Sequence, residues 1–277
     1  MSLSSLAHRS FRRLFSKRAV CLSICSLFLL AQLATPSVAA TQNVIYTALG
    51  DSLAFGLFAP IGDSYVLAYS RQVRADTGVS ATTVNLGIPG WTSSDLLNAI
   101  RGNFLLRLSV VTSSIVTLDI GGNDLLGARG SYGNGTCGGA DNQDCLRATV
   151  ATFKSNWNAI LSEILSLRST RNTVIRTMDI YNPFVDEDRA QDTWPNDQGN
   201  NFQVSKVYLD QINNHIALTS AARNIPYARV YQAFNGPNGD RDARELDYIA
   251  FDGLHPNGRG HARIAELFSN LGYSPLR

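Results

Sequence analysis

The segment that decides the fold is VIYTALGDSL, residues 44–53, in which β-branched and apolar residues are followed at once by a glycine and two polar residues. A short apolar run of this kind, bounded by a turn, predicts a buried β-strand. We expect the strand to end at Leu49, so that Gly50, Asp51 and Ser52 lie at its carboxyl end. Polar residues at that end of a strand are candidates for a binding or catalytic site.

The rest of the chain repeats this unit of a short strand followed by a longer helical segment. Between the β-rich runs, apolar residues recur at intervals of three and four, which is the period of an amphipathic helix. The alternation predicts an α/β fold, with one five-stranded parallel sheet and helices on both faces, in a single domain over residues 41–277. The further strands are expected at 82–86, 115–120, 173–178 and 228–231, and the helical segments at 97–104, 146–164, 209–216 and 264–271.

Two polar segments are too long to be simple connections between such elements. They run from Gly127 to Asp144 and from Asn182 to Asn201. Both are expected to follow the carboxyl end of a strand, where open α/β sheets bind their ligands. We therefore predict that these segments form walls of a binding site.

Composition and charge disfavour two classes of protein. The whole chain has a formal net charge of +2, but its first 40 residues contain five Lys or Arg and no Asp or Glu, so residues 41–277 carry a net charge of −3. This disfavours a nucleic-acid binder, which is usually basic. A hydrophobic content of 44% and a charged content of 17% are typical of a folded protein with a large core, and not of a disordered one.

The first 40 residues have the order of a secretory signal peptide. A basic stretch that ends at Arg18 precedes an apolar run over residues 19–33, and small residues follow up to Ala39 and Ala40. A membrane anchor is the rival interpretation, but a span needs about 20 apolar residues and this run has 15. We predict cleavage near Ala39 or Ala40, no stable membrane span afterwards, and a secreted or periplasmic protein. The segment RRLFSK, residues 12–17, also resembles a twin-arginine signal, which implies export of the folded chain.

Two of the four cysteines, Cys137 and Cys145, remain after the leader. In an oxidising compartment, such a pair within one segment rich in Gly and Asn predicts a disulfide, and the small ring it closes stabilises the fold by roughly 2–3 kcal/mol. Two free thiols are the alternative. A zinc site is disfavoured because no further Cys or His lies nearby.

Four short motifs each follow a predicted strand, the last of them after a loop. They are GDSL at 50–53, NLG at 85–87, GGND at 121–124 and DGLHP at 252–256. In a parallel sheet all four would meet at one edge. With these motifs in this order, the sequence resembles the SGNH, or GDSL, hydrolase family, with a motif in each of its four catalytic blocks. The resemblance implies the family's three-layer, flavodoxin-like fold and an esterase or lipase activity without metal or cofactor.

The residue types in the motifs suit the hydrolysis of an ester. The reaction needs a nucleophile, a base that deprotonates it, a group that orients the base, and donors for the developing oxyanion. Ser52 supplies the hydroxyl, His255 would take its proton through Nε2, and Asp252 would accept a hydrogen bond from Nδ1. For the oxyanion the resemblance implies the backbone N–H groups of Ser52 and Gly87 and the side-chain amide of Asn123.

Each of these residues also has a purely structural interpretation. Ser52 could cap a helix, Gly87 and Gly90 could be turn residues around Pro89, and Asn123 could stabilise its own loop. Four such residues at successive strand ends nevertheless fit a catalytic site better than four coincidences.

The other titratable residues near these motifs are interpreted as structural. His215 and His261 lie in helical patterns, where a packed or solvated side chain is the usual role. Asp119 and Asp124 are expected to accept hydrogen bonds beside the third motif, and Asp51 is expected to brace the turn that carries the nucleophile.

Two other motif families are excluded. An α/β-hydrolase elbow needs a glycine two positions after the serine, and Ala54 occupies that position here. Gly133, Gly135 and Gly138 match a dinucleotide-binding pattern, but no strand precedes them and no helix follows at once, so the match is accidental.

Apolar residues cluster in the sequence beside two of the motifs. An acyl-chain pocket needs such residues, because each buried methylene contributes about 0.8 kcal/mol. A sugar esterase more often presents aromatic platforms, for which Tyr132 and Trp194 are candidates. We predict a small-molecule or lipid acyl ester of short to medium chain as the substrate. The cluster contains Leu53, Leu57, Phe58, Pro89 and the candidate substrate-binding residues Phe55, Ile88 and Trp91.

Together these observations predict an exported serine esterase or lipase that works through an acyl-enzyme. A carbohydrate-ester deacetylase with the same machinery is the alternative among enzymes. A non-catalytic exported binding module is the alternative from another class, and the intact Ser52, Asn123, Asp252 and His255 argue against it.

Overall fold

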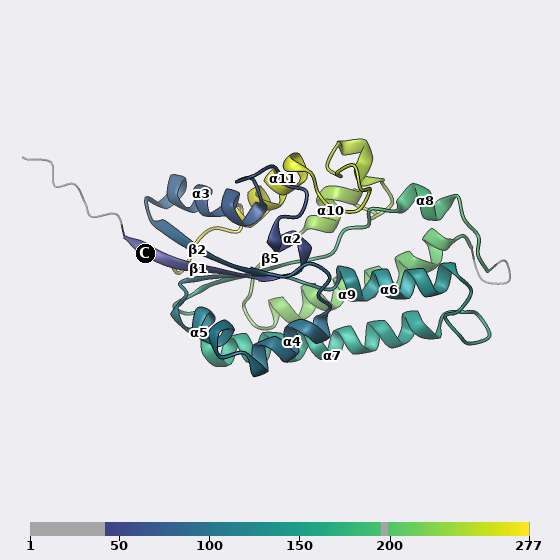
Figure 1. Cartoon of the computed structure of the whole chain (residues 1–277), viewed down its shortest axis with the longest axis horizontal. Coiled ribbons are helices and arrows are strands. Elements are labelled where there is room, and N and C mark those ends of the chain that lie inside the picture. The colour runs from purple at the N-terminus through teal and green to yellow at the C-terminus, as the bar shows by residue number, and fades with distance from the viewer. Residues whose placement is uncertain (1–41, 195–198, 277) are drawn as a thin grey trace, which may run out of the picture. The chain divides into compact units, whose positions relative to one another are not determined.

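A computed structural model of the chain describes residues 42–194 and 199–276, and Figure 1 shows the arrangement of their elements. The signal peptide and its cleavage site, predicted within residues 1–40, lie outside the described residues and stay a prediction. Within the described ranges, no helix has the length and apolar character needed to cross a membrane.

A five-stranded parallel sheet forms the middle layer, as the alternation of strands and helices predicted. Its strands are β1 (Asn43–Gly50), β2 (Ser80–Gly87), β3 (Ile115–Asp119), β4 (Val174–Met178) and β5 (Tyr227–Ala228), in the order β2-β1-β3-β4-β5. The register pairs Gly50 at the end of β1 with Gly87 in β2 and with Asp119 in β3. The residues that follow these three strands therefore emerge side by side at one edge of the sheet.

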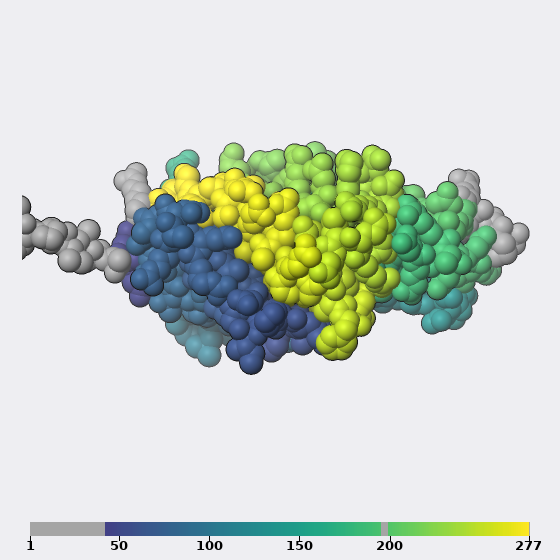
Figure 2. All heavy atoms as spheres, turned by 90° about the horizontal axis from the view of Figure 1, so that it is seen from above, coloured from purple at the N-terminus to yellow at the C-terminus, as the bar shows by residue number. Residues whose placement is uncertain are grey.

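Helices cover both faces of this sheet, which confirms the predicted three-layer fold (Figure 1). One face carries α3 (Tyr65–Thr77), α10 (Val230–Asn235) and α11 (Gly258–Ser269), and the other carries α4 (Ser93–Gly102), α5 (Phe104–Thr112), α7 (Asp144–Leu167) and α9 (Asn201–Ala221). Figure 2 looks onto the first face, where α3 and α11 lie side by side although they are far apart in the chain. The remaining elements are α2 (Ser52–Phe55), α6 (Gly122–Gly133), α8 (Val185–Arg189) and the short 3-10 helix η1 (Ala243–Leu246).

Apolar side chains fill the space between each helical layer and the sheet. The apolar positions predicted in α7 are all buried, and the rings of Phe153 and Trp157 stack at 5.7 Å. On the other face, Tyr69 and Phe268 pack ring against ring at 5.6 Å. Two well-packed layers hold the ends of the strands in fixed positions, and those ends carry the candidate site.

The predicted fifth strand, residues 228–231, is largely wrong. β5 ends at Ala228, and Val230 begins α10. The carboxylate of Asp179, which follows β4, accepts a hydrogen bond of 2.7 Å from the backbone N–H of Tyr231 in the first turn of α10. This cap comes from a residue far away in the sequence, so the β-rich composition of the run gave no sign of it.

The helical segment expected at 97–104 also ends earlier than predicted. α4 stops at Gly102, and the Asn103 side chain caps the next helix by accepting hydrogen bonds from Leu105 N at 2.9 Å and Leu106 N at 3.2 Å. The new helix starts in a different direction, and Phe104 is 72% exposed. Apolar residues therefore keep the helical spacing across residue 103, although one helix ends and another begins there.

The first long polar segment, Gly127–Asp144, is partly helical. α6 continues to Gly133 despite the glycines in its sequence, which have low helix propensity. It packs against α7 and α9, and such tertiary contacts outweigh the weak local preference. Residues 127–133 of the segment therefore belong to α6, and residues 134–143 form the loop between α6 and α7.

Candidate active site

Ser52 lies at the tip of the turn that follows β1. It is the first residue of α2, and Asp51 before it caps this short helix, because its Oδ1 accepts a hydrogen bond of 3.0 Å from Leu53 N. The first N–H groups of a helix have no partner within the helix. The Ser52 hydroxyl and its backbone N–H are thus both placed at the edge of the sheet.

Two buried carboxyl groups brace this turn. Besides the cap made by Asp51, the Oδ2 atom of Asp119 accepts from Ala54 N at 3.1 Å, and its Oδ1 accepts from the Tyr65 hydroxyl. Burial is the main reason why the pKa of Asp51 is raised to about 7 and the pKa of Asp119 is raised well above its usual range; the charge of Asp51 adds to the shift in Asp119. Both residues have the structural roles that their positions in the sequence indicated.

His255 and Asp252 lie on a single turn that precedes α11. The Oδ1 atom of Asp252 accepts from Leu254 N at 3.2 Å and from His255 N at 3.1 Å, which fixes the aspartate relative to the histidine. The Tyr181 hydroxyl donates to the carbonyl of Leu254 at 2.6 Å. This bond ties the turn to the segment after β4, so the imidazole is held from two sides.

Ser52, His255 and Asp252 form one continuous series of hydrogen bonds. His255 Nε2 lies 2.9 Å from Ser52 Oγ, across 203 positions of sequence, and His255 Nδ1 lies 2.5 Å from Asp252 Oδ2. A carboxylate can only accept, so Nδ1 carries the hydrogen and Nε2 is left as the acceptor for the hydroxyl. Partial burial opposes ionisation of Asp252, but the hydrogen bonds from the His255 side chain and from backbone N–H groups outweigh it and lower the pKa of Asp252. The arrangement gives a serine hydroxyl whose proton a neutral imidazole can take.

Asn123 is placed beside these residues by the start of α6. Gly121 caps the helix with a φ of 117°, and a Cβ there would meet Ile180 Cδ1 at 2.8 Å, so only glycine fits. The Asn123 amide donates to the carbonyl of Trp91 at 2.8 Å, and its other contact, with Asp51 Oδ2, is long at 3.4 Å. Asn123 therefore presents a partly used donor to the pocket described below.

Gly87 does not fit the predicted role of oxyanion donor. Its N–H donates to Asn85 Oδ1 at 3.0 Å, and Asn85 Nδ2 in turn donates to the carbonyl of Ala54 at 2.6 Å. A Cβ at Gly87 would meet the Cβ of Ala54 at 2.6 Å. The missing side chain lets β2 pack closely against α2; it does not open the backbone to a substrate.

Gly90, three positions further on, lies in a turn whose backbone is open to solvent. It has a φ of 84°, it is exposed, and a Cβ there would meet no atom within 4 Å. The next residue, Trp91, accepts the hydrogen bond from Asn123, which brings this turn against the start of α6. In the sequence, the Pro89-Gly90 pair is the signal for such a turn, whereas Gly87 was the donor that the family resemblance implied.

An apolar pocket with a volume of about 110 Å³ begins at Ser52 and His255. It extends between α6 and the segment 178–188, and residues of both predicted wall segments line it. The positions that α6 contributes recur at helical spacing from Gly122 onward, which a closer look at the sequence after the third motif could have found. The apolar lining includes Leu125, Leu126, Leu146, Ile180, Pro183 and Phe184.

The three candidate substrate-binding residues, Phe55, Ile88 and Trp91, do not line this pocket. Phe55 is 54% exposed and Ile88 is 42% exposed, while Trp91 packs partly buried against the core. They were chosen for their nearness to Ser52 in the sequence, but the pocket is built from helices and loops that are distant in the chain. Of the apolar residues near Ser52 in the sequence, Leu53 lines the pocket, and the ring centroid of Phe58 lies 5.3 Å from that of the His255 imidazole.

Cys137 and Cys145 lie in the loop between α6 and α7 and at the start of α7. Their Sγ atoms are at bonding distance and their Cα atoms are 4.9 Å apart. Within the described ranges, no group of three or more His, Cys, Asp and Glu is arranged to hold a metal ion. The oxidised state of the pair in the natural protein stays a prediction.

We expect Cys137 and Cys145 to be joined in the protein isolated from an oxidising compartment. Reduction should loosen the loop between α6 and α7 more than the sheet, because the ring is small and local. Mass spectrometry of unreduced peptides tests the bond, and hydrogen exchange before and after reduction tests the local effect. Recovery of both thiols freely alkylated would contradict the prediction.

Comparison with known proteins places this geometry in a family. The model of the GDSL-like Lipase/Acylhydrolase family matches residues 48–263. The spore germination lipase LipC of Bacillus licheniformis is 26% identical over 234 residues, which cover 83% of this chain and 97% of LipC.

Solved structures share the fold. The lipase Lip_vut3 from a goat rumen metagenome superposes with a TM-score of 0.68 at 22% identity and covers 84% of this chain and all of that one. A variant of Axe2, an acetyl xylan esterase from Geobacillus stearothermophilus, superposes with a TM-score of 0.56 at 17% identity, covering 86% of this chain and 98% of that one. The family match spans most of the chain and includes Ser52, Asn123, Asp252 and His255. The chain therefore belongs to the GDSL-like lipase and acylhydrolase family.

Proposed function

We propose that the chain is a serine hydrolase that cleaves carboxylic acyl esters through an acyl-enzyme. The observation that carries the proposal is the hydrogen-bonded series of Ser52, His255 and Asp252 at the mouth of an apolar pocket. A hydroxyl activated by an oriented base needs only a substrate carbonyl within reach to act as a nucleophile. The pocket offers an acyl chain an apolar surface directly beside that hydroxyl.

In the first half of the reaction, Ser52 Oγ attacks the carbonyl carbon of the ester while His255 Nε2 takes the hydroxyl proton. The imidazolium that forms is stabilised by the Asp252 carboxylate at Nδ1. The negative oxygen of the tetrahedral intermediate accepts hydrogen bonds from the Ser52 N–H, the Gly90 N–H and the Asn123 amide. Collapse of the intermediate breaks the bond to the alcohol, which leaves with the proton from His255.

In the second half, water takes the place of the alcohol. His255 removes a proton from the water as the water attacks the acyl-enzyme, and the same donors stabilise the second oxyanion. The bond between Ser52 Oγ and the acyl group then breaks, the serine regains its proton from His255, and the carboxylic acid leaves the pocket.

A fluorophosphonate probe tests the proposal against a non-catalytic binding module. We expect stoichiometric labelling of Ser52, identified by mass spectrometry of the modified peptide, because the probe reacts with activated serines. Ser52→Ala should not be labelled, while Ser166→Ala, which alters an exposed serine in α7, should label like the parent protein. An unlabelled parent protein would support the binding module instead.

Fatty-acyl esters are favoured over acetylated sugars as substrates by the lining of the pocket. The side chains next to Ser52 that face the pocket are largely apolar. Tyr132, a candidate platform for a sugar, is 2% exposed, and Trp194 packs partly buried against the core. A structural neighbour that is an acetyl xylan esterase keeps the deacetylase as the second candidate.

We expect kcat/KM to increase with acyl chain length until the pocket is full. Each added methylene that becomes buried should raise it by up to about fourfold, the rate equivalent of about 0.8 kcal/mol. A series of p-nitrophenyl esters, which share one leaving group, measures this directly alongside an acetylated xylooligosaccharide. Equal rates from acetyl to octanoyl, or activity confined to the acetylated sugar, would favour the deacetylase.

Activity should fall at acid pH along a single ionisation. Only the neutral imidazole of His255 can act as base, so its protonation removes activity. The lowered pKa of Asp252 keeps that residue ionised at neutral and mildly acid pH, so Asp252 adds no second ionisation there. The measurement is kcat/KM against pH with and without a chelator, and the profile should be the same in both.

Asp51 provides the control for this assignment, because its raised pKa, about 7, lies near the same range. Asp51→Asn removes this carboxyl group but keeps a residue that can cap α2, since asparagine caps as well as aspartate. The acid limb should persist in the variant. A limb that disappears in Asp51→Asn would assign it to Asp51, and loss of activity in EDTA that zinc restores would contradict the metal-free mechanism.

We also propose that the protein is exported, on the basis of the basic, apolar and small-residue order of residues 1–40. N-terminal sequencing of the protein from the cell exterior or periplasm tests this, with Ala40 or Thr41 expected as the first residue. Replacing Arg12 and Arg13 with lysine tests the twin-arginine route, because that route requires the arginine pair. Full-length protein recovered from the cytoplasm alone would contradict export.

A further inference from the structure

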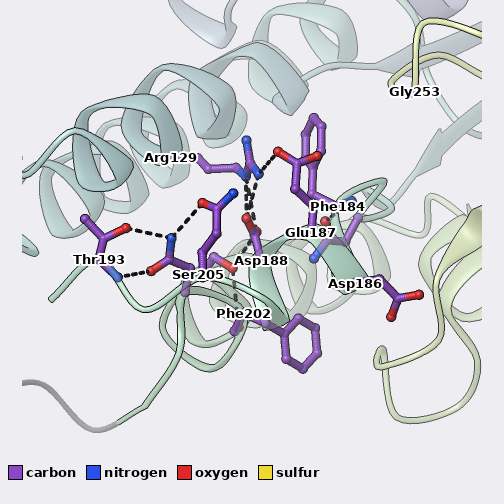
Figure 3. Close-up of polar contacts among 12 residues, drawn as sticks. Arg129, Phe184, Asp186, Glu187, Asp188, Thr193, Phe202, Ser205 and Gly253 are labelled. Carbon is purple, nitrogen blue, oxygen red and sulfur yellow. Dashed lines mark hydrogen bonds and ion pairs between the residues drawn. The ribbon is translucent and has the colours of Figure 1, made fainter. Parts of the chain in front are cut away.

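Arg129 forms an ion pair in the wall of the apolar pocket. It reaches from α6 to the short helix α8, where its Nη2 lies 2.6 Å from Asp188 Oδ1 and 3.0 Å from Glu187 Oε1, and its Nε lies 3.0 and 3.1 Å from the two Asp188 oxygens (Figure 3). The guanidinium also lies over the ring of Phe184, 3.9 Å from its centroid. One arginine thus fixes the position of α8 and of an aromatic side chain that lines the pocket.

The position of Arg129 on α6 puts it away from the catalytic residues. Asn123, next to the reacting atoms, and Arg129 are six residues apart, which is a rise of about 9 Å along an α-helix. Leu125 and Leu126 lie between them, and all four residues line the pocket. A chain bound at Ser52 and extending along α6 therefore meets first apolar side chains and then the ion pair.

A second, polar pocket with a volume of about 210 Å³ begins at this ion pair. Residues common to both pockets are Arg129, Leu146, Asp188 and Ser205, whereas Ser52 and His255 line only the apolar one. The Arg129–Asp188 ion pair, together with Leu146 and Ser205, therefore separates the two pockets. The second pocket offers space for a longer ligand on the far side of these residues.

Several contacts fix the position of the Arg129–Asp188 ion pair between the two pockets. The Asp188 side chain is 2% exposed, and besides Arg129 it has a contact of 3.4 Å with the Ser205 hydroxyl. Moving Arg129 aside would leave a buried carboxylate without its counter-ion, which is strongly unfavourable. A bidentate arginine pair also has a defined geometry, and stacking on an aromatic ring restricts it further. A methylene chain that reached this point would have to disrupt charged hydrogen bonds without replacing them.

We propose that the Arg129–Asp188 ion pair sets the upper limit of acyl chain length by closing the far end of the acyl pocket. The inference rests on the proposed ester hydrolase function. It makes Arg129 a specificity-determining residue that acts on the length of the substrate and takes no part in the chemistry. Removing the pair should join the two cavities and admit longer chains.

The test is the double variant Arg129→Ala/Asp188→Ala, which removes both charges and leaves neither unpaired. The control is Arg107→Ala/Glu163→Ala, which removes a pair of 3.2 Å between α5 and α7 whose residues line neither pocket. For each protein, kcat/KM is measured on p-nitrophenyl esters from acetyl to dodecanoyl. Arg129→Lys is a milder second variant, because lysine keeps the charge but loses the fork and the stacking.

In the parent protein and the control, we expect kcat/KM to decline beyond one optimal length. In the double variant kcat/KM should continue to rise past that length, by less than the roughly fourfold per methylene expected in the apolar pocket, because the second pocket is polar. Arg129→Lys should show a smaller shift in the same direction. Profiles of the double variant or of Arg129→Lys that run parallel to the parent profile would overturn the inference. A parent protein that hydrolyses none of the esters and does not react with the fluorophosphonate would instead overturn the proposed function on which the inference rests.

Discussion

Replacing Ser52 or His255 with alanine should lower kcat for ester hydrolysis by about 10⁴ to 10⁶, because nucleophile and base act as one unit and either loss disables both. The rate that remains would come from the oxyanion donors and from substrate binding. Asp252→Asn should cost about 10⁴, since an amide in place of the carboxylate favours the wrong tautomer of His255. The measurement is kcat on an activated ester with protein purified free of host esterases.

The folded state of these variants is checked by circular dichroism and thermal unfolding. Two matched replacements serve as controls: His215→Ala alters a histidine in α9, away from the site, and Ser166→Ala alters an exposed serine. Both should retain the parent activity. A Ser52→Ala protein that hydrolyses esters at the parent rate would refute the assignment of the nucleophile.

Asn123→Ala is expected to lower kcat by about 10² to 10³ with a much smaller change in KM. In the proposed mechanism the Asn123 amide donates to an oxyanion that exists only near the transition state, so its loss should affect the chemical step more than substrate binding. Asn123→Asp keeps the size of the side chain but loses the donor, and it should be at least as severe. Steady-state kinetics on the optimal ester separates the two parameters.

An effect of the Asn123 substitution on KM alone would change the role assigned to this residue. A large rise in KM with unchanged kcat would make Asn123 a ground-state binding residue. The hydrogen bond to Trp91 is the structural part of its role, and thermal unfolding of the variant measures how much the turn depends on it.

The sheet and the ends of its strands could be predicted because their signals are local. The runs that became β1 to β4 combine β-branched residues with nearby turn residues, and the motifs after β1 and β3 directly place Ser52 and Asn123. His255 and Asp252 were found in the same way, by residue types three positions apart on one turn. In these cases the residues that decide the structure lie within a few positions of one another.

The features that were missed depend on contacts between distant segments. The start of α10 is capped by Asp179, which lies 52 positions away, and the backbone at Gly87 is closed off by Ala54 of α2. The acyl pocket joins α6 to a segment after β4, so nearness to Ser52 in the sequence pointed to Phe55 and Ile88 instead. Position in the chain is a poor guide to a cavity whose walls are brought together only by the fold.

The distance of 203 positions between Ser52 and His255 has a consequence for the timing of activity during protein synthesis. Ribosomes make the chain from its N-terminus, so the serine emerges long before the histidine that activates it. By the proposed mechanism, a nascent or prematurely terminated chain that lacks the turn before α11 would have an ordinary, unreactive serine. Ester hydrolysis would then begin only once the last part of the chain has been made and has folded against the first.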